Sequence, residues 1–588
     1  MNEVFYITTP IYYVNSHPHI GHAYTTIATD VFTRYMKLFG AETYFLTGTD
    51  EHGQKIAESA ANSGISPQKF ADKISKEFRE LWPHLHIENN QFIRTTDSKH
   101  KVCVQQILQK IYDQGEIYIK EYEGLYCIGC ERFLDETELE NGNCPDHQTP
   151  PEFHKEQNYF FRMSSYQGWL TEELNQNENW IYPKRYRNEL IQLLKNPLQD
   201  LCISRPKSRL TWGIELPFDN KFVTYVWFDA LLNYASALDW PNGLKFKKFW
   251  QHAHHTIGKD ILKTHGIYWP CMLKAAGIPV FKKLIVHGHW VVEGNKMSKS
   301  LGNVVDPLAI KDKLGVDAMR YFLLRDMSFG EDSNFSEELA IIRYNGDLAN
   351  NFGNLMNRSI SMIRKNFQEC VPPSGKIGDS EKELHKSFTE GVKKCQEYIY
   401  KFQPHRALEH VAFLSSKVNK YIDTCKPWTL TKDEKDRERL GTVLYTALDM
   451  TRIIVGLLDP VMPKKMYIAR INLGLGEEII PFSSLAPGLL ESGIKLPKPS
   501  PLFPKMQATN EDEDNLKNKQ LEKISNESLL EDKEWLALDD FQKIELKVGH
   551  IKSCKKVAKS NKLLCSEVDL GENRLRSIVS GAAEFYSP

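Results

Sequence analysis

Two histidines stand three residues apart in the segment HPHIGHAYT at 17–25. VFYITTP before it is typical of a short buried strand, and apolar residues then recur at helical spacing from about Gly21 to a stop at Gly40. His19 and His22 therefore fall at a helix start, where unpaired N–H groups and the helix dipole favour anions. Gly21 allows a ligand to approach the backbone closely. The segment predicts a phosphate site, and partly exposed loop histidines are the alternative.

A second cationic segment, KMSKS at 296–300, lies in a loop between two glycines. Lys296, Ser298 and Lys299 could bind a triphosphate as this loop closes, because the ammonium groups would neutralise charge on the leaving group. A solvated surface loop is the alternative reading of such a segment taken alone.

The elements that must position these residues form an α/β pattern. The strand, loop and helix at the N-terminus are followed by a second strand, ETYFLTG, which is the opening of a parallel unit with a right-handed crossover. The pattern breaks at about 117–221 and resumes at KFVTYVWFDALLNYASAL. Helical periodicity dominates from about 340 to 470 and predicts a bundle. The polar stretch from about 504 to 534 predicts a tether, and strand-like alternation follows it.

Bulk composition limits the function classes. The chain has 588 residues, 41% of them hydrophobic, and a formal net charge of −1, which is mild evidence against a general polyanion binder. Its 11 cysteines argue for a reducing compartment and against a disulfide framework. We identify no apolar run as long as a membrane span and no secretory signal, so a cytoplasmic protein is expected.

Four potential metal ligands occur in YCIGCERFLDETELENGNCPDH. Cys127, Cys130, Cys144 and His147 form two knuckles, Cys-x2-Cys and Cys-x2-His, separated by thirteen residues. This spacing predicts one closed, structural Zn²⁺ site with tetrahedral Cys₃His ligation. Unrelated cysteines in a reducing compartment, or a redox pair, are the alternatives.

Together the histidine and lysine motifs resemble the signature pair of class I aminoacyl-tRNA synthetases. The flanking segments PIYYVNSHPHIGHAYT, TGTDEHGQKI, TYVWFDALLNY, IGKDI and VHGHWVVEGNKMSKSLGN resemble the methionyl-tRNA synthetases in their bacterial form. The resemblance covers residues 1 to about 500, and a weaker likeness continues to the end.

The resemblance implies a two-step reaction. In the first step, methionine attacks the α-phosphate of ATP, which carries Mg²⁺, and pyrophosphate leaves. In the second step, the methionyl-adenylate esterifies the 3′ end of initiator or elongator tRNA(Met), and AMP leaves. His19, His22, Lys296 and Lys299 are the implied catalytic residues, and Gly21 and Ser298 join them in binding ATP. The residues implied to bind methionine are Ile11, Tyr13, Asp50, Trp227, Ala230, Leu231, Tyr234 and His287. Asp50 would pair with the substrate ammonium, and an apolar aromatic box would hold the thioether.

The helical region resembles the part of this family that reads the CAU anticodon. The implied contacts are Asn350, Asn354, Arg358 and Trp428, and a splayed loop read by aromatic and amide groups is the usual mode of sequence-specific RNA recognition. Helix capping and core packing are the alternatives. The tail resembles the start of a tRNA-binding OB module, which needs five strands to close. A complete module would support a homodimer, and a truncated one a monomer.

The predicted fold is an α/β, Rossmann-like catalytic domain with a zinc-knuckle insertion, a helical bundle and a partial OB-like β module. The expected parts are the catalytic halves 1–116 and 222–315, the insertion 117–221, a stem-contact connector 316–345, the anticodon-binding domain 346–503, a charged linker 504–535 and the β module 536–588. A synthetase for cysteine, leucine, valine or isoleucine is one competing hypothesis. The insertion of about 105 residues is shorter than the editing domains of the last three. A tRNA-binding protein without catalysis is the other hypothesis. No membrane or DNA partner is expected.

Overall fold

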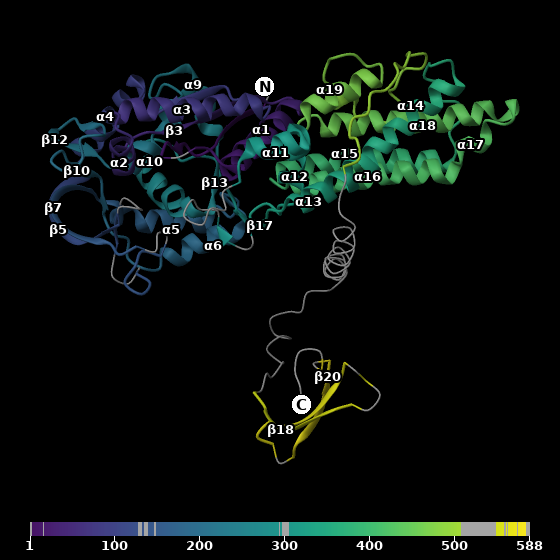
Figure 1. The fold of residues 1–588 in the computed structure, drawn as a ribbon. Coiled ribbons are helices and arrows are strands. Elements are labelled where there is room, and N and C mark those ends of the chain that lie inside the picture. The colour runs from purple at the N-terminus through teal and green to yellow at the C-terminus, as the bar shows by residue number, and fades with distance from the viewer. Residues whose placement is uncertain are drawn as a thin grey trace. The chain divides into compact units, whose positions relative to one another are not determined.

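The computed structural model describes residues 3–15, 17–127, 132–134, 139–145, 149–292, 295–296, 305–506, 548–557, 560, 562–572, 574–581 and 583 (Figure 1). The chain divides into two compact units, Met1–Ala508 and Thr509–Pro588, which are described separately. From residue 507 onward the predicted linker lies outside the described residues.

A parallel sheet forms the centre of the first unit. Its strand order is β2-β3-β1-β13-β14-β8, and β4 pairs with β3. The bounds are β1 Val4–Thr8, β2 Tyr12–Tyr13, β3 Glu42–Asp50, β4 Gln91–Arg94, β8 Ile181–Tyr182, β13 Ala253–Gly258 and β14 Lys283–His287. In the register, Ile7 lies opposite Phe45 on one side and His254 on the other. Central strands are buried on both faces because helices cover them, which explains their continuous apolar runs. This sheet confirms the predicted α/β class.

Helix α1, Ile20–Leu38, joins β1 and β3 as the motif predicted, and the chain turns at Gly40 with φ 95°. The helix is buried along most of its length because it lies between the sheet and the helical region. Asp30 forms a buried ion pair with Arg320, at 2.6 Å, and Nε of Arg320 donates to the Val461 carbonyl at 2.7 Å. The Tyr35 hydroxyl donates to the Leu457 carbonyl at 2.7 Å. Helix α1 is thus bonded directly to the helical region.

The predicted insertion contains two antiparallel sheets beside short helices. Strands β5 Ile117–Cys127, β6 Arg132–Leu134, β7 Glu152–Phe161 and β9 Leu201–Cys202 form one sheet, ordered β6-β5-β7-β9. A second sheet contains β10 Ser204–Pro206, β12 Asp219–Thr224 and β11 Glu215–Leu216. The sequence pattern predicted that the parallel fold resumes at KFVT, but these residues lie in β12, which pairs antiparallel with β10 and β11. The parallel sheet gains β8 from within the predicted insertion, where Ile181 and Tyr182 pair with β14, and it continues at β13.

Shorter elements surround the sheets. Their bounds are α2 Gln54–Asn62, α3 Pro67–His84, α4 Ser98–Asp113, α5 Gln167–Gln176, α6 Lys184–Leu193, α7 Val226–Leu231, α8 Asn233–Ser236, α9 Leu244–Phe249, α10 Trp269–Ala275, β15 Trp290–Val292, β16 Asn295–Lys296 and β17 Ser333–Asn334. Short 3-10 or π segments are η2 Met163–Tyr166, η3 Trp250–His252, η4 Lys259–Ile261 and η5 Thr264–Tyr268.

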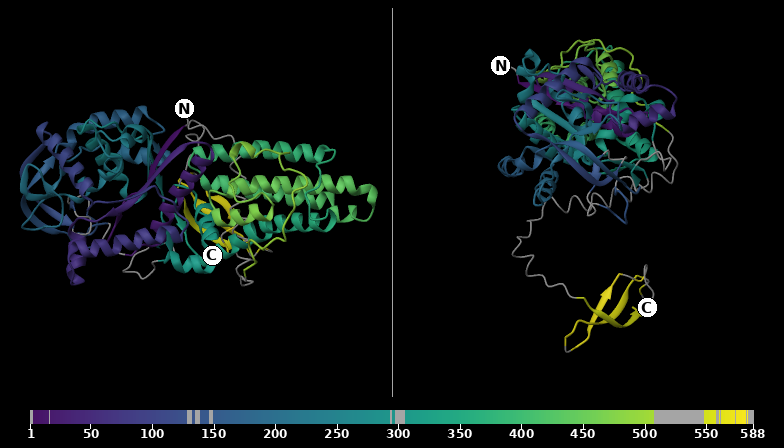
Figure 2. Two further views of the ribbon diagram at one scale, coloured as in Figure 1. Left: turned by 90° about the horizontal axis from the view of Figure 1, so that it is seen from above. Right: turned by 90° about the vertical axis from the view of Figure 1, so that its left-hand side faces the viewer.

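A helical bundle follows, as predicted. It contains α11 Pro307–Leu314, α12 Val316–Arg325, α13 Glu337–Arg343, the π segment η6 Tyr344–Gly353, α14 Asn354–Asn366, α15 Asp379–Tyr400, α16 Pro404–Cys425, α17 Pro427–Leu430, α18 Arg437–Leu458 and α19 Pro463–Asn472, with η7 Glu434–Asp436 and η8 Phe482–Ser484. The long helices, drawn in green in Figure 2, lie side by side, and α16 packs on both α15 and α18.

The sequence analysis missed one helix that is long and apolar enough for a membrane span. Among the described residues, Glu434–Leu458 meets that test of length and composition. Its apolar window is buried entirely inside the protein, and α18 forms the centre of the bundle, so packing explains its composition.

The second unit contains a three-stranded antiparallel sheet, ordered β18-β19-β20. The bounds are β18 His550–Lys556, β19 Leu564–Asp569 and β20 Arg576–Ser580. Leu564 and Val568 are its buried apolar residues. The predicted alternation of strands is confirmed for these three.

Candidate active site

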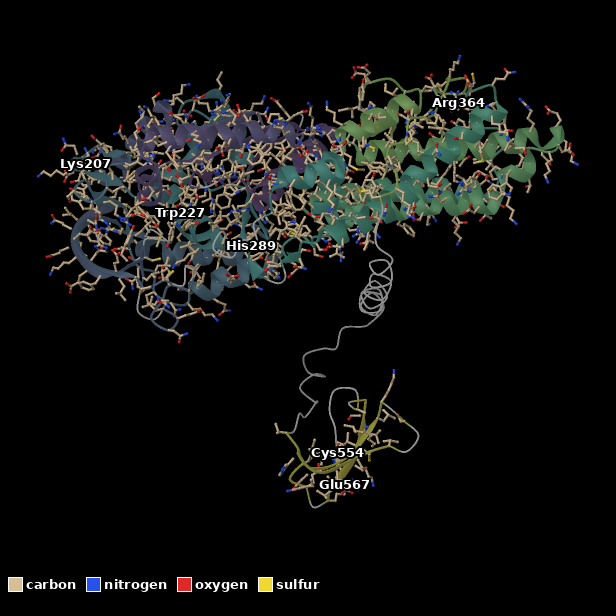
Figure 3. All side chains as sticks on the ribbon, viewed as in Figure 1. Lys207, Trp227, His289, Arg364, Cys554 and Glu567 are labelled. Atoms are coloured by element: carbon tan, nitrogen blue, oxygen red, sulfur yellow. The ribbon has the colours of Figure 1, made fainter. Side chains whose placement is uncertain are left out.

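One cavity of about 380 Å³ opens at the carboxyl ends of the central strands. Ligands of open α/β sheets bind at this edge of the sheet. Eleven of the residues predicted for ATP and methionine line it: Ile11, Tyr13, His19, Gly21, His22, Asp50, Trp227, Ala230, Leu231, Tyr234 and His287. They come from segments more than 200 positions apart in the sequence. Figure 3 labels two residues of the lining, Trp227 and His289.

The two motif histidines form a reciprocal cap at the start of α1. His19 is the N-cap, and its Nδ1 accepts from the backbone N–H of Gly21 at 3.1 Å. Nδ1 of His22 accepts from the backbone N–H of His19, also at 3.1 Å. The ring centroids are 3.8 Å apart. Because both Nδ1 atoms are acceptors, the neutral rings carry their protons on Nε2 and present N–H donors.

The charge state of His22 follows from burial. Burial lowers the pKa of His22 well below its usual value, and the neighbouring His19 lowers it further. His22 is therefore neutral at pH 7 and can donate one hydrogen bond to an anion without an ionic charge of its own.

The helix start differs from the sequence prediction in its amide donors. The backbone N–H of Ile20 donates to the Val305 carbonyl at 3.1 Å, and that of Gly21 donates to His19. These two amides are already bonded within the protein, so they are not free donors for a ligand as the sequence predicted. Gly21 also has a second reason for lacking a side chain, since a Cβ here would lie 2.9 Å from Cε1 of His19.

Aromatic rings line the side of the cavity formed by α7 and α8. Tyr13 and Trp227 meet edge to face, with centroids 6.0 Å apart. Trp227 and Tyr234 lie on two consecutive short helices, and both line the cavity. Nδ1 of His265 lies 3.0 Å from the Ile261 carbonyl, so it carries the proton and Nε2 accepts from the Tyr234 hydroxyl at 2.8 Å.

The remaining predicted residues close the cavity. Asp50 ends β3 and is 2% exposed. His287 ends β14, where its Nε2 lies 2.9 Å from the Thr25 hydroxyl and its Nδ1 2.7 Å from the Gly288 carbonyl. Burial lowers the pKa of His287 to about 4, so the ring is neutral.

Sequence reasoning missed more than half of the lining. The additional residues are Pro10, Tyr12, Asn15, Tyr24, Thr25, Asn233, Gly258, Asp260, Ile261, His265, Gly288, His289 and Trp290. The segment IGKDI at 257–261 was part of the resemblance, and its position at the carboxyl end of β13 could have identified Gly258 and Asp260. His265 lies in the π segment η5 and carries no pattern of its own.

The lysine loop begins beside this cavity. Backbone pairing of Val291 with Lys296 joins β15 to β16 directly after the cavity residue Trp290. Ser298 and Lys299 lie outside the described residues, as does the side chain of Lys296.

Comparison with known proteins decides the family. The family described as tRNA synthetases class I (M) matches residues 5–150 and 135–360, and the anticodon binding domain of methionyl tRNA ligase matches 371–521. The chain belongs to the class I methionyl-tRNA synthetases. A tRNA binding domain family also matches residues 546–588. The resemblance found in the sequence is therefore confirmed.

Individual relatives agree with this assignment. The methionine–tRNA ligase of Caldanaerobacter subterraneus subsp. tengcongensis is 44% identical over all of this chain and 92% of its own length. That of Clostridium perfringens is 43% identical over 99% of this chain and 91% of its own length. The structure of Mycobacterium tuberculosis methionyl-tRNA synthetase in complex with methionyl-adenylate is similar with a TM-score of 0.83 and 38% identity, over 85% of this chain and 100% of that chain.

Two of the four predicted zinc ligands of this synthetase lie in described residues. Cys127 and Cys144 belong to one small buried cluster with Leu134. The backbone of Cys127 in β5 pairs with that of Arg132 in β6, and the backbone N–H of Cys144 donates to the Thr149 carbonyl at 3.0 Å. Cys130 and His147 lie outside the described residues.

The predicted anticodon residues of the synthetase lie on the bundle in two groups. Asn350 and Asn354 line a cavity of about 530 Å³ beside residues 499–503. Nη2 of Arg358 forms an ion pair with Asp423 at 2.7 Å, and its guanidinium carbon lies 5.9 Å from the ring centroid of Trp428. Trp428 is 46% exposed.

Proposed function

We propose that this synthetase activates methionine with ATP and transfers it to tRNA(Met). The observation that carries the proposal is the meeting of eleven predicted residues in one cavity at the carboxyl edge of the sheet. The relative with a TM-score of 0.83 was solved with methionyl-adenylate, the intermediate of this reaction.

His19, His22 and Gly21 form the proposed ATP side of the cavity. The Nε2–H donors of the two adjacent imidazoles would bind phosphate oxygens and stabilise charge at the α-phosphorus, where positioning and electrostatics supply most of the catalysis. Lys296, Ser298 and Lys299 would bind the pyrophosphate side. Mg²⁺ would enter with ATP, because this ion is commonly held by substrate phosphates.

The other side is proposed to bind methionine through Ile11, Tyr13, Asp50, Trp227, Ala230, Leu231, Tyr234 and His287. Asp50 would pair with the substrate ammonium, since a buried carboxylate is the matching charge. The rings of Tyr13 and Trp227 would contact the thioether, a soft group that packs well against aromatic edges.

Cys127, Cys130, Cys144 and His147 are proposed to hold one structural Zn²⁺. The buried pair of described cysteines and the backbone bonds that bring Cys127 to Arg132 and Cys144 to Thr149 fit a double knuckle. The ion would stabilise the tip of the insertion, and metal analysis of washed protein should give one zinc per chain. A folded chain without metal would contradict the site.

The bundle is proposed to bind the anticodon through Asn350, Asn354, Arg358 and Trp428. Trp428 is half exposed beside a guanidinium, which suits base stacking. The second unit is proposed to bind tRNA without sequence preference, and a homodimer through it would appear as a doubled mass in light scattering. Activity in the cytoplasm accords with the reducing compartment inferred from the cysteines.

The test is amino-acid-dependent pyrophosphate exchange. We expect exchange with methionine and none with cysteine, leucine, valine or isoleucine. Exchange with leucine but not methionine would overturn the assignment, and no exchange with any amino acid would favour an RNA-binding protein without catalysis. Lys299→Ala should slow adenylate formation far more than it weakens methionine binding.

A further inference from the structure

A buried polar network lies behind the methionine side of the cavity. Asp229 of α7 is 0% exposed, and each of its carboxylate oxygens meets an imidazole. Oδ2 lies 2.6 Å from Nδ1 of His52, and Oδ1 lies 2.6 Å from Nε2 of His100. Both histidines are themselves buried. Such a carboxylate is tolerated in the interior only because both oxygens accept hydrogen bonds.

The network continues from α7 to α8. Nδ1 of His100 lies 2.8 Å from the hydroxyl of Ser236, and that hydroxyl lies 3.2 Å from the Asn233 carbonyl. His52 follows β3 two residues after Asp50, and His100 lies in the first turn of α4. Helix α4 is therefore bonded to both short helices, and the segment after β3 is bonded to α7.

These two helices have little stability of their own. Helix α7 has six residues and α8 has four, and neither has a side-chain N-cap bond among the described residues. Isolated helices of this length do not form in water, so tertiary contacts set their position. They carry four of the proposed methionine contacts, namely Trp227, Ala230, Leu231 and Tyr234.

The network residues do not line the cavity themselves and would act on the ligand through the helices α7 and α8. The described residues that line the cavity do not include His52, His100, Asp229 or Ser236. Burial alone would raise the pKa of Asp229, but His52 and His100 hold it below its usual value, so the carboxylate is ionised and accepts both bonds. A fixed bonding pattern of this kind resists displacement of the helices.

We propose that His52, Asp229, His100 and Ser236 are positioning residues that fix the helices α7 and α8 against Asp50, and thereby set the shape of the methionine pocket. This inference rests on the proposed function. It predicts that weakening the network loosens selection of the amino-acid side chain and leaves ATP binding unchanged, because the histidine cap of α1 lies on a different element.

The test compares His100→Ala with His100→Gln in methionine-dependent pyrophosphate exchange. The glutamine amide retains an N–H donor toward Asp229, so it should recover most of the loss. We expect His100→Ala to raise the KM for methionine about tenfold, which corresponds to 1.4 kcal/mol, with less than a twofold change in the KM for ATP. The preference for methionine over norleucine should fall as well.

His86→Ala is the matched control. Nδ1 of His86 bonds Asp317 at 2.8 Å, another histidine–aspartate contact, but one outside the cavity lining. Its side chain is 23% exposed, so this variant removes a histidine–aspartate contact without changing the surroundings of α7 and α8. This variant should lower the thermal midpoint without changing the ratio of the two KM values.

Several outcomes would overturn the inference. Equal changes in both KM values, or a glutamine variant no better than alanine, would show a merely structural role. If His100→Ala does not fold, Ser236→Ala serves in its place, because it removes only one hydroxyl. This variant should also raise the KM for methionine and not the KM for ATP, and an unchanged KM for methionine would refute the network. Absence of exchange in the wild-type chain would instead refute the proposed function.

Discussion

Gly21→Ala separates the stability of α1 from its role in binding ATP. A methyl carbon at this position would lie 2.9 Å from Cε1 and 3.0 Å from Nδ1 of His19, which is inside van der Waals contact. The backbone on either side is helical and fixed, so the imidazole must rotate away. Rotation breaks the bond from the Gly21 amide to Nδ1 and disturbs the contact of the His19 ring with the ring of His22.

The two effects on stability oppose each other. Loss of an N-cap contact costs about 0.5–2 kcal/mol, and replacement of glycine by alanine within a helix stabilises it by about 1 kcal/mol. The net change in the free energy of unfolding should therefore stay within about 1 kcal/mol. The effect on catalysis has no such compensation, because a displaced donor no longer stabilises the developing charge, and the loss of one such donor costs about 10²–10³-fold in rate.

The assay is pyrophosphate exchange measured beside thermal denaturation. We expect exchange to fall at least about a hundredfold while the midpoint moves by only a few degrees. His19→Ala serves as the comparison, since it removes the same ring and should give a loss of similar size. Exchange within threefold of wild type would refute the role of His19, and a large drop in the midpoint would show that the cap matters for folding instead.

Three further predictions follow from the buried groups and the bundle. Arg320→Met should lower the free energy of unfolding, measured by urea denaturation, by about 3–5 kcal/mol. The double variant Arg320→Met and Asp30→Asn should lose less than the sum of the losses of the two single variants. Additive losses would contradict the ion pair. The free energy of unfolding should fall as the pH drops from about 6.5 toward 4. Burial holds the pKa of His265 and His287 at about 4, so the unfolded chain binds more protons than the folded chain in that window. Equal urea midpoints at pH 7 and pH 5 would exclude this linkage. Trp428→Ala should impair charging of tRNA and leave pyrophosphate exchange unchanged, and a parallel loss of exchange would indicate a folding defect.

The sequence motifs predicted where the cavity lies better than they predicted the buried residues around it. His19 and Asp50 follow strands whose apolar runs and flanking turns are plain in the sequence, so their edge of the sheet could be inferred. His265 and His100 could not, since each is a single buried histidine whose partner lies far away in the chain. Burial and partner choice are set by tertiary packing, which leaves no period in the local sequence.

The dependence of strand pairing on tertiary packing also explains why the sequence assigned the segment of β12 to the resumed α/β pattern. Its run of apolar and β-branched residues identifies a strand, but no strand pattern specifies which neighbour it will join. The structure pairs β12 with β10 and β11 rather than with the parallel sheet. The helical region was predicted more successfully because its period of 3.6 is carried by the segment itself.

Helix α1 fixes the distance between the histidine cap of the cavity and the helical bundle. Its first turn holds the imidazole of His22, and its last turns are bonded to the bundle through the hydroxyl of Tyr35. One inserted residue turns everything beyond it by about 100° and moves it about 1.5 Å along the axis. Natural insertions or deletions between these two positions should therefore be absent from active descendants of this chain, whereas loops elsewhere in the catalytic half remain free to change length.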